Sequence, residues 1–261
     1  MRVEFENGKV RFRNLIGSHL PANPKLPLVH TTDTYRFVDA LSDGVLSASP
    51  CKVFNNEPLL YFFYGRPSYK QNNDALPTGL LHYFPVCLII PPSNDITPKR
   101  VFPFDSGAFH NDLYSNVIHS KMKMEDFGLE PNLNSPAQLI SAAFGTVENY
   151  LNGQALPSCN CDPSEFEMHS FHALVSSEQA NDVDSRGSSV EIQLNSNIFI
   201  QGRVAAAILP ASFVGGEVGT KMTEVGIESL PYNVVRNMKP NDFTSTIFDL
   251  CPNYYRKNGY V

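Results

Sequence analysis

The apolar residues of this chain are gathered in short runs, which Pro, Gly and polar segments separate from one another. The two longest runs, residues 85–92 and 204–210, fall far below the ~18 apolar residues that a membrane-spanning helix needs. Their length and their branched side chains favour buried strands. We therefore expect a fold built around a sheet, and no membrane partner.

Two stretches have helical spacing of their apolar residues. Residues 34–41 follow a capping Thr32 or Asp33 and stop before Gly44, and residues 135–151 form the second stretch. Because strands and helices do not alternate strictly, the pattern predicts the α+β class. The expected strands are residues 26–31, 45–46, 59–64, 84–90, 171–175, 190–194 and 203–210, whereas residues 100–109 are too rich in Pro and Gly to predict a regular element.

Length and composition indicate a globular chain with one substantial core. The chain has 261 residues, of which 42% are hydrophobic, and it shows no internal repeat. Residues 1–25 are polar, with a short alternating run at 10–13, and are predicted to form an N-terminal arm or hairpin. Residues 26–261 are predicted to form a single domain.

The formal charge is −6, from 20 Lys and Arg against 26 Asp and Glu. An acidic balance disfavours charge-driven binding of nucleic acid. One basic groove remains compatible with this average, and its candidate residues are Lys52, Arg66, Lys70, Lys99 and Arg100.

The cysteines and the amino terminus indicate a cytoplasmic protein. Five cysteines, an odd number in a long chain, fit a reducing compartment, and the first residues lack the apolar core of a secretory signal. Two thiols and two imidazoles lie close in sequence, but both spacings are tighter than in usual zinc sites. We therefore expect no metal and free thiols, with Cys159, Cys161, His169 and His172 as weak metal candidates.

Several common classes of enzyme lack their sequence signature here. Ser106 stands near Asp105 and His110, but no Gly-x-Ser-x-Gly elbow surrounds it. The chain also has no Gly-rich phosphate-binding loop, no His-Glu-x-x-His motif and no dinucleotide fingerprint. Serine hydrolases, kinases, zinc proteases and nicotinamide dehydrogenases are therefore disfavoured.

Three residues from distant segments remain as candidates: His30 at the end of an early strand, Tyr61 in an aromatic run, and Glu191 in a late strand. Taken alone, each fits an ordinary place in a core, at its rim or on a solvated strand face. In chain order, their surroundings resemble the ADP-ribosyltransferase superfamily. The resemblance is to its His-Tyr-Glu branch, which includes poly(ADP-ribose) polymerases, diphtheria-type toxins and DarT-type DNA-modifying toxins.

The resemblance rests on residues 28–32 with the helix and Gly44 that follow, on residues 60–63, and on residues 188–193 with the next strand. It covers about residues 26–210. It implies a split antiparallel or mixed β-sheet core with a few helices. It also implies that NAD is a substrate and not a redox cofactor.

The resemblance assigns roles to the residues that match. Glu191 would stabilise the cation-like ribose that forms as the nicotinamide–ribose bond breaks. Aromatic rings would stack on the nicotinamide, His30 with Thr31 or Thr32 would bind ribose hydroxyls, and a guanidinium would bind the pyrophosphate. The implied NAD-binding residues are His30, Thr31, Thr32, Tyr61, Tyr64, Arg66 and Tyr69, and the implied catalytic residues are Glu191, Tyr61 and His30.

The segment before the catalytic strand corresponds to the loop that chooses the acceptor in this superfamily. It spans residues 178–189 and contains Arg186. Arginine-modifying toxins carry a second glutamate where this chain has Ser189, and Gln193 shares the face of Glu191. Arginine is thus a less favoured acceptor, and protein and nucleic acid both stay open.

The expected function is an NAD-dependent ADP-ribosyltransferase that modifies a macromolecule as a toxin or antiviral defence effector, which an inhibitory partner could hold off. One alternative is an NAD glycohydrolase with water as the acceptor. Another is a non-catalytic binding or partner module on the same fold. A metal-dependent function through the Cys and His cluster is the third.

Overall fold

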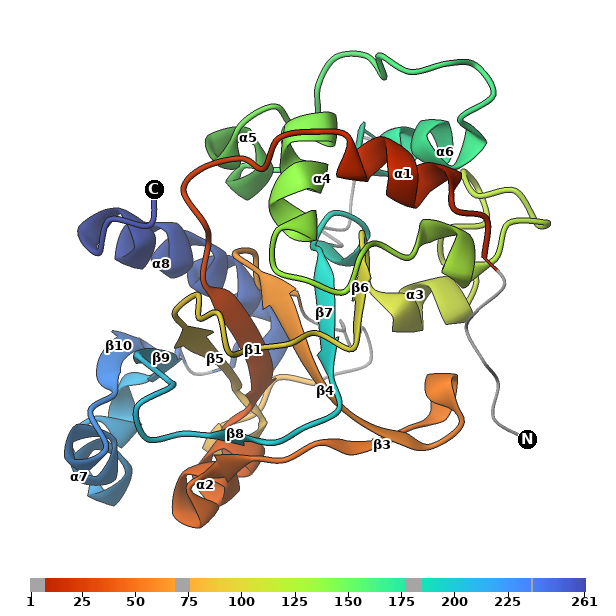
Figure 1. Cartoon of the computed structure of the whole chain (residues 1–261). Helices are drawn as coiled ribbons and strands as arrows, with labels where there is room; N and C mark the ends of the chain where they lie inside the picture. The colour runs from red at the N-terminus through yellow and green to blue at the C-terminus, as the bar shows by residue number, and fades with distance from the viewer. Residues whose placement is uncertain (1–7, 69–75, 177–184, 236) are drawn as a thin grey trace.

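The computed structural model describes residues 8–68, 76–176, 185–235 and 237–261. Within those ranges its centre is a mixed sheet of eight strands (Figure 1). The strands are β1 (Leu28–Asp33), β3 (Ser49–Cys51), β4 (Glu57–Tyr64), β5 (Pro85–Ile90), β6 (Arg100–Phe102), β7 (Glu191–Leu194), β9 (Ala206–Pro210) and β10 (Glu228–Tyr232).

The strand order is β10-β9-β5-β1-β4-β7-β6, and β3 pairs with β4. Only β9 and β10 pair in parallel, and the other neighbours are antiparallel. A second, two-stranded sheet joins β2 (Val45–Leu46) to β8 (Ile198–Phe199). The order brings together strands that are far apart in the sequence, since β4 lies between β1 and β7.

The α-helices of the described chain are α1 (Arg11–Gly17), α2 (Thr34–Asp43), α3 (Ser106–His110), α4 (Ser135–Ala143), α5 (Val147–Leu151), α6 (Phe166–Ser176), α7 (Glu217–Glu224) and α8 (Thr244–Lys257). Short 3-10 turns occupy Lys52–Phe54, Leu81–Tyr83, Met124–Phe127, Ser185–Gly187, Ala211–Phe213 and Pro240–Phe243. The α+β prediction is confirmed. Across the described ranges, no helix combines the length and the apolar character needed to cross a bilayer.

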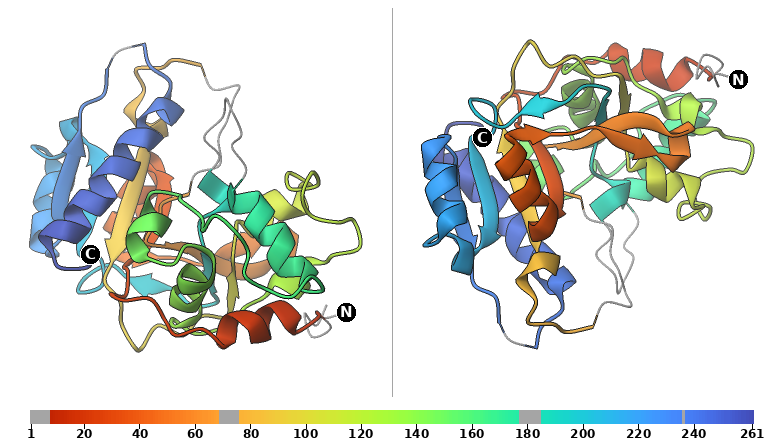
Figure 2. Two further views of the ribbon diagram at one scale, coloured as in Figure 1. Left: turned by 90° about the horizontal axis from the view of Figure 1, so that it is seen from above. Right: turned by 90° about the horizontal axis from the view of Figure 1, so that it is seen from below.

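Helices cover both faces of the sheet at β5, whose residues are all buried. Figure 2 shows α8 on one side of this strand and α2 on the other. On the α8 side, Cys87 of β5 lies 3.9 Å from Cys251, measured between the two Sγ atoms. Helices α1, α3, α4, α5 and α6 gather at the β6 and β7 end of the sheet, whereas α7 packs at the β10 end (Figure 1).

The helix predicted over residues 34–41 is confirmed as α2. Asp33 begins it by accepting a hydrogen bond from the Arg36 amide at 2.9 Å. Gly44 ends it in the left-handed conformation, with φ of 72°. The second predicted helix is divided in two, because Gly145 adopts a φ of 76° between α4 and α5.

The prediction of a strand over residues 171–175 is wrong, because this segment lies in α6. The buried residues Met168, Phe171 and Val175 follow a spacing of three and four, which places them on one helical face. The alternation seen from Phe171 onward is only part of this longer helical pattern. Residues 100–109 also form regular structure, as β6 and α3.

The prediction of an N-terminal arm or hairpin is also corrected, because its described part contains α1. Phe12 and Ile16 lie one helical turn apart and are fully buried, and the Phe12 ring lies 5.9 Å from that of Phe171. Arg11 donates two hydrogen bonds, at 2.7 and 3.0 Å, to the buried carboxylate of Glu167. Helix α1 is therefore part of the core.

A buried tyrosine hydroxyl holds the ends of β4 and β7 together. Tyr150 of α5 donates to the carbonyl of Tyr64 at 2.7 Å and accepts from the amide of Val190 at 3.2 Å. Val190 in turn accepts from the Tyr64 amide at 2.9 Å. One side chain thus satisfies two backbone groups next to Glu191.

We predict that Tyr150→Phe lowers the free energy of unfolding by about 1–3 kcal/mol, because it leaves the buried Val190 amide without its partner and removes one of the two donors to the Tyr64 carbonyl. Denaturant unfolding measures the change. Tyr35→Phe is the matched control, since Tyr35 is 62% exposed and should tolerate loss of its hydroxyl. Equal stabilities of the two variants would contradict the prediction.

Candidate functional site

Strand pairing places Tyr61 and Glu191 on one face of the sheet. Phe63 is opposite Val29 on β1 and opposite Glu191 on β7, and Tyr61 is opposite Gln193. Paired residues point to the same side and alternate residues share a face. Tyr61, Phe63, Glu191 and Gln193 therefore share their face with Val29, and alternation along β1 adds Thr31 to it.

This face lies under a cavity of about 440 Å³, which is within the usual size range of ligand pockets. Its walls come from β1, β4, β7, the start of α3 and the segment leading into α8. The cavity is lined by Thr31, Thr32, Tyr61, Ser68, Ser106 and Glu191. Asp105, Cys51, Tyr83, Asn241 and Thr244 line it as well.

The Glu191 carboxylate is held by three hydrogen-bond donors and is 2% exposed. Oε1 accepts from Ser106 Oγ at 2.8 Å and from Gln193 Nε2 at 2.7 Å, and Oε2 accepts from the Ser106 amide at 3.0 Å. Ser106 is the first residue of α3, and Asp105 caps that helix by accepting from the Ala108 amide at 2.7 Å. The α3 amino terminus thus fixes the position of Glu191.

Burial raises the pKa of Glu191 to about 8, with the neighbouring Asp105 carboxylate as the second cause. The hydrogen bonds from Gln193 and Ser106 act in the opposite direction and lower the pKa. Glu191 therefore takes up a proton at higher pH than an exposed glutamate does. A positive charge brought into the cavity would favour its ionised form.

A polar chain extends from Glu191 to the edge of the sheet. Arg100 donates to Gln193 Oε1 at 3.1 Å and to Glu57 Oε2 at 2.7 Å, and its guanidinium lies 4.7 Å from the centre of the Phe54 ring. Because Arg100 binds the amide oxygen of Gln193, the amide nitrogen is turned toward Glu191. Lys99 pairs with the same Glu57.

The Tyr61 hydroxyl donates to Cys51 Sγ at 2.8 Å. Burial, and after it this hydrogen bond and the charge of Glu191, raise the pKa of Tyr61 far above its ordinary value. The phenol therefore stays neutral. Its ring contributes an aromatic wall to the cavity beside Glu191.

His30 lies on the other face of the sheet. Its ring centre is 5.6 Å from that of Phe62, which points away from Tyr61 and Phe63, and its Nδ1 is 2.8 Å from the Tyr61 carbonyl oxygen. Burial lowers the pKa of His30. His30 does not line the cavity, whereas Thr31 and Thr32 do.

Two more of the residues predicted to bind NAD lie away from the cavity. The Tyr64 hydroxyl accepts from the Leu26 amide at 3.0 Å inside the core, and burial raises the pKa of Tyr64 to about 12. Arg66 is 9% exposed, donates to Ser188 Oγ at 2.9 Å and lies over the Tyr150 ring at 5.6 Å.

The predicted acceptor loop is described only in part. Tyr69, Lys70 and residues 178–184 lie outside the described residues. Arg186 accepts a backbone hydrogen bond from Asp105 at 3.0 Å, and Ser189 is fully buried. Neither lines the cavity. The basic groove is not formed at the cavity either, since Lys52, Arg66, Lys99 and Arg100 do not line it.

Sequence reasoning missed the role of Ser106, which it considered only as a hydrolase nucleophile near Asp105 and His110. The available signal was the cap: an Asp three residues before Ala108 opens a short helix, and Ser106 stands at its first position. What the sequence does not contain is the pairing of this helix start with β7, which is 85 residues away.

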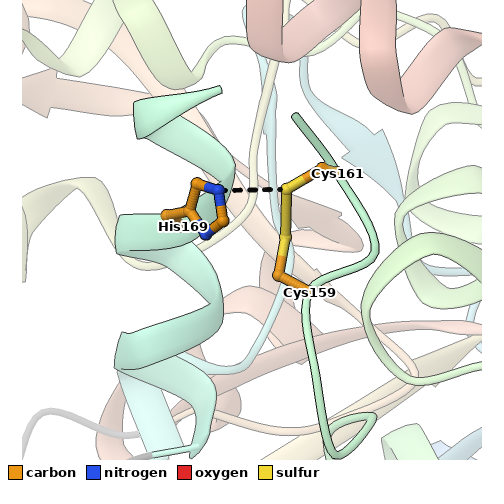
Figure 3. A group of neighbouring side chains, drawn as sticks. All are labelled: Cys159, Cys161 and His169. Atoms are coloured by element: carbon orange, nitrogen blue, oxygen red, sulfur yellow. Dashed lines mark hydrogen bonds between the residues drawn. A yellow bond between two sulfur atoms is a disulfide. The ribbon is translucent and has the colours of Figure 1, made fainter. Parts of the chain in front are cut away.

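The prediction of free thiols is corrected for two cysteines. Cys159 and Cys161 form a disulfide, with His169 Nε2 3.6 Å from Cys161 Sγ (Figure 3). His172 does not join them, because its Nε2 lies 2.7 Å from the Leu156 carbonyl oxygen. Cys51, Cys87 and Cys251 do not take part in a disulfide.

The raised pKa of Glu191 predicts a stability that depends on pH. Protonated Glu191 suits the folded state, so its contribution is complete below the ordinary pKa of 4.5 and is lost as pH rises toward 8. The difference in unfolding free energy between wild type and Glu191→Gln should therefore fall with pH by up to about 1.4 kcal/mol per unit. Denaturant unfolding between pH 5 and 9 measures it, and a constant difference would contradict the burial argument.

Ser106→Ala should raise the pKa of Glu191 further, because it removes one of the donors that favour the carboxylate. The carboxyl carbon of Glu191, followed by NMR during a pH titration, would then titrate at higher pH than in wild type. Ser115→Ala is the control, since Ser115 is exposed. A downward shift or no shift in Ser106→Ala would show that the Ser106 hydroxyl does not stabilise the carboxylate.

No protein-family model and no curated protein sequence matches this chain. The function must therefore be argued from the chemistry of the cavity.

Proposed function

We propose that this protein is an ADP-ribosyltransferase that cleaves NAD as a substrate and transfers ADP-ribose to a macromolecule. The observation that carries the proposal is the placement of Glu191 and Tyr61 on one face of adjacent strands, at the walls of one cavity. The three segments that resemble the superfamily supply β1, β4 and β7. These strands pair in the order β1-β4-β7, which supports a sheet of the ADP-ribosyltransferase kind.

In this proposal the nicotinamide ring stacks on Tyr61 and the adjoining ribose lies next to Glu191. The nicotinamide ring of NAD is positively charged, so its arrival lowers the pKa of Glu191 and favours the ionised carboxylate. The resulting carboxylate faces the sugar as positive charge develops there. Because Ser106 and Gln193 already fix the carboxylate, little reorganisation is needed in the transition state.

The resemblance assigned the binding of ribose hydroxyls to His30, and in this proposal the threonines next to His30 bind them. Thr31 lies on the face of Glu191, and its Oγ1 donates to the Ser68 carbonyl at 2.7 Å, which fixes it at the cavity wall. Thr32 also lines the cavity. We assign ribose binding to these two threonines and a structural contact with the Tyr61 carbonyl to His30.

A non-catalytic binding module is the second candidate. It is favoured by the three donors that already occupy the Glu191 carboxylate and by the orientation of His30 away from the cavity. A role as toxin or defence effector, with an inhibitory partner, rests on the resemblance alone. The choice between a macromolecule and water as acceptor rests on the experiment below.

We predict that the purified protein releases nicotinamide from NAD and that Glu191→Gln lowers the rate by about 100-fold or more, because the carboxylate acts in the transition state. Nicotinamide release is measured by chromatography, with and without cell lysate as the acceptor source. Glu224→Gln, an exposed change of the same kind, should leave the rate unchanged.

The lysate separates the candidate functions. Release that requires lysate indicates a transferase, and equal release in its absence indicates an NAD glycohydrolase. Absence of release in every condition, from wild type that is folded and binds NAD, would favour the binding module.

A further inference from the structure

A second chemically active group lies outside the cavity. Cys159 and Cys161 stand on the segment between α5 and α6, and His169 projects from α6 toward them (Figure 3). Their three ligand atoms, two sulfurs and one ring nitrogen, lie within 4.8 Å of one another. Both cysteines are half-buried and His169 is exposed, so solutes reach the group from solvent.

We propose that this group is a redox-gated metal site. In the reduced protein, the thiolates of Cys159 and Cys161 and the imidazole Nε2 of His169 bind one thiolate-preferring divalent cation of the Zn²⁺ class. In the oxidised protein the disulfide removes two of these three ligands, and the cation is not held.

The distance between Cys161 and His169 fits shared coordination. With Zn–S of about 2.3 Å and Zn–N of about 2.05 Å at a tetrahedral angle, the sulfur and nitrogen ligands lie roughly 3.6 Å apart. The Sγ–Nε2 distance in the structure is 3.6 Å. Imidazole and thiolate are also the ligand types that Zn²⁺ prefers.

The two sulfurs are the part that must move. Two thiolates on one Zn²⁺ stand roughly 3.8 Å apart at the same bond length and angle, so reduction has to separate the bonded sulfurs. Their Cα atoms are 5.6 Å apart, and both residues lie in a segment without regular structure. Rotation of the two side chains is therefore expected to separate the sulfurs. The Cys-x-Cys spacing is tight for zinc, but the third ligand comes from a helix and not from the same loop.

The fourth position is left to water or an external ligand. His172 is outside the group of ligand atoms that lie within 4.8 Å of one another, and its Nε2 contacts the Leu156 carbonyl at 2.7 Å. His169 contacts the Asp162 carbonyl at 3.1 Å and would exchange this contact for the metal. Three protein ligands with one open position are the pattern of zinc sites that exchange ligands, whereas purely structural sites are closed.

A dithiol reductant supplies the electrons and protons that open the disulfide. The reductant gives up two electrons and two protons, becomes a disulfide, and converts the Cys159–Cys161 disulfide into two thiols. Zn²⁺ then displaces the two thiol protons. A small disulfide oxidant reverses the sequence, re-forms the protein disulfide and releases the cation.

The test is Zn²⁺ binding to the full chain, measured by competition with a chromophoric chelator after dithiothreitol treatment and removal of the reductant. Thiol counting establishes the redox state of each sample. The reduced wild type should bind one Zn²⁺ per chain, and the oxidised wild type should bind none. Cys161→Ser and His169→Gln should raise the Kd by at least about tenfold, since each removes a ligand.

His172→Gln is the matched control, because this residue is on the same helix and its replacement keeps a donor for the Leu156 carbonyl. Co²⁺ adds a spectroscopic check, since thiolate-to-metal absorption should appear in reduced wild type and His172→Gln and weaken in Cys161→Ser. Equal Zn²⁺ affinity in wild type and His169→Gln would overturn the proposal. Binding of Zn²⁺ by the oxidised protein would overturn it as well.

Discussion

The burial of one carboxylate beside the amino terminus of α3 organises this site. Glu191 is buried on β7, next to the edge strand β6, where an isolated charge would be costly, and Ser106 and Gln193 supply the donors that stabilise it. Those donors are themselves fixed. Asp105 caps the helix that carries Ser106, and Arg100, held by Glu57, orients the amide of Gln193. Hydrogen bonds therefore fix the side chains at the floor of the cavity. The protonation state of Glu191 is the property of this floor that can change.

Strand alternation decides which residues of the three segments can act together. A sheet has two faces, and a shift of one residue moves a side chain from one face to the other. Tyr61 and Glu191 share a face with Thr31, and His30 shares the opposite face with Phe62. The same alternation that separates His30 from the cavity leaves a threonine hydroxyl in a position to bind a ligand.

The elements that local patterns specify were predictable, and the long-range contacts were not. Helix α2 has its cap and its stop in the sequence, at Asp33 and Gly44, and the strands at β4, β5, β7 and β9 are marked by their apolar residues. Helices α1 and α6 were not predicted, because the contacts that stabilise them form only in the fold. These are the hydrogen bond between Arg11 and Glu167 and the ring contact between Phe12 and Phe171. The contact between Ser106 and Glu191 escaped for the same reason, although Glu191 and Tyr61 were themselves correctly expected on strands.

The central claim is that the cavity over β1, β4 and β7 receives the nicotinamide end of NAD. A crystal structure of Glu191→Gln grown with NAD tests it most directly, because this change keeps the side chain's shape while slowing turnover. The account predicts the nicotinamide ring against Tyr61, with its ribose next to residue 191 and its hydroxyls near Thr31 or Thr32. NAD bound elsewhere on the protein, or an empty cavity at saturating NAD, would contradict the claim.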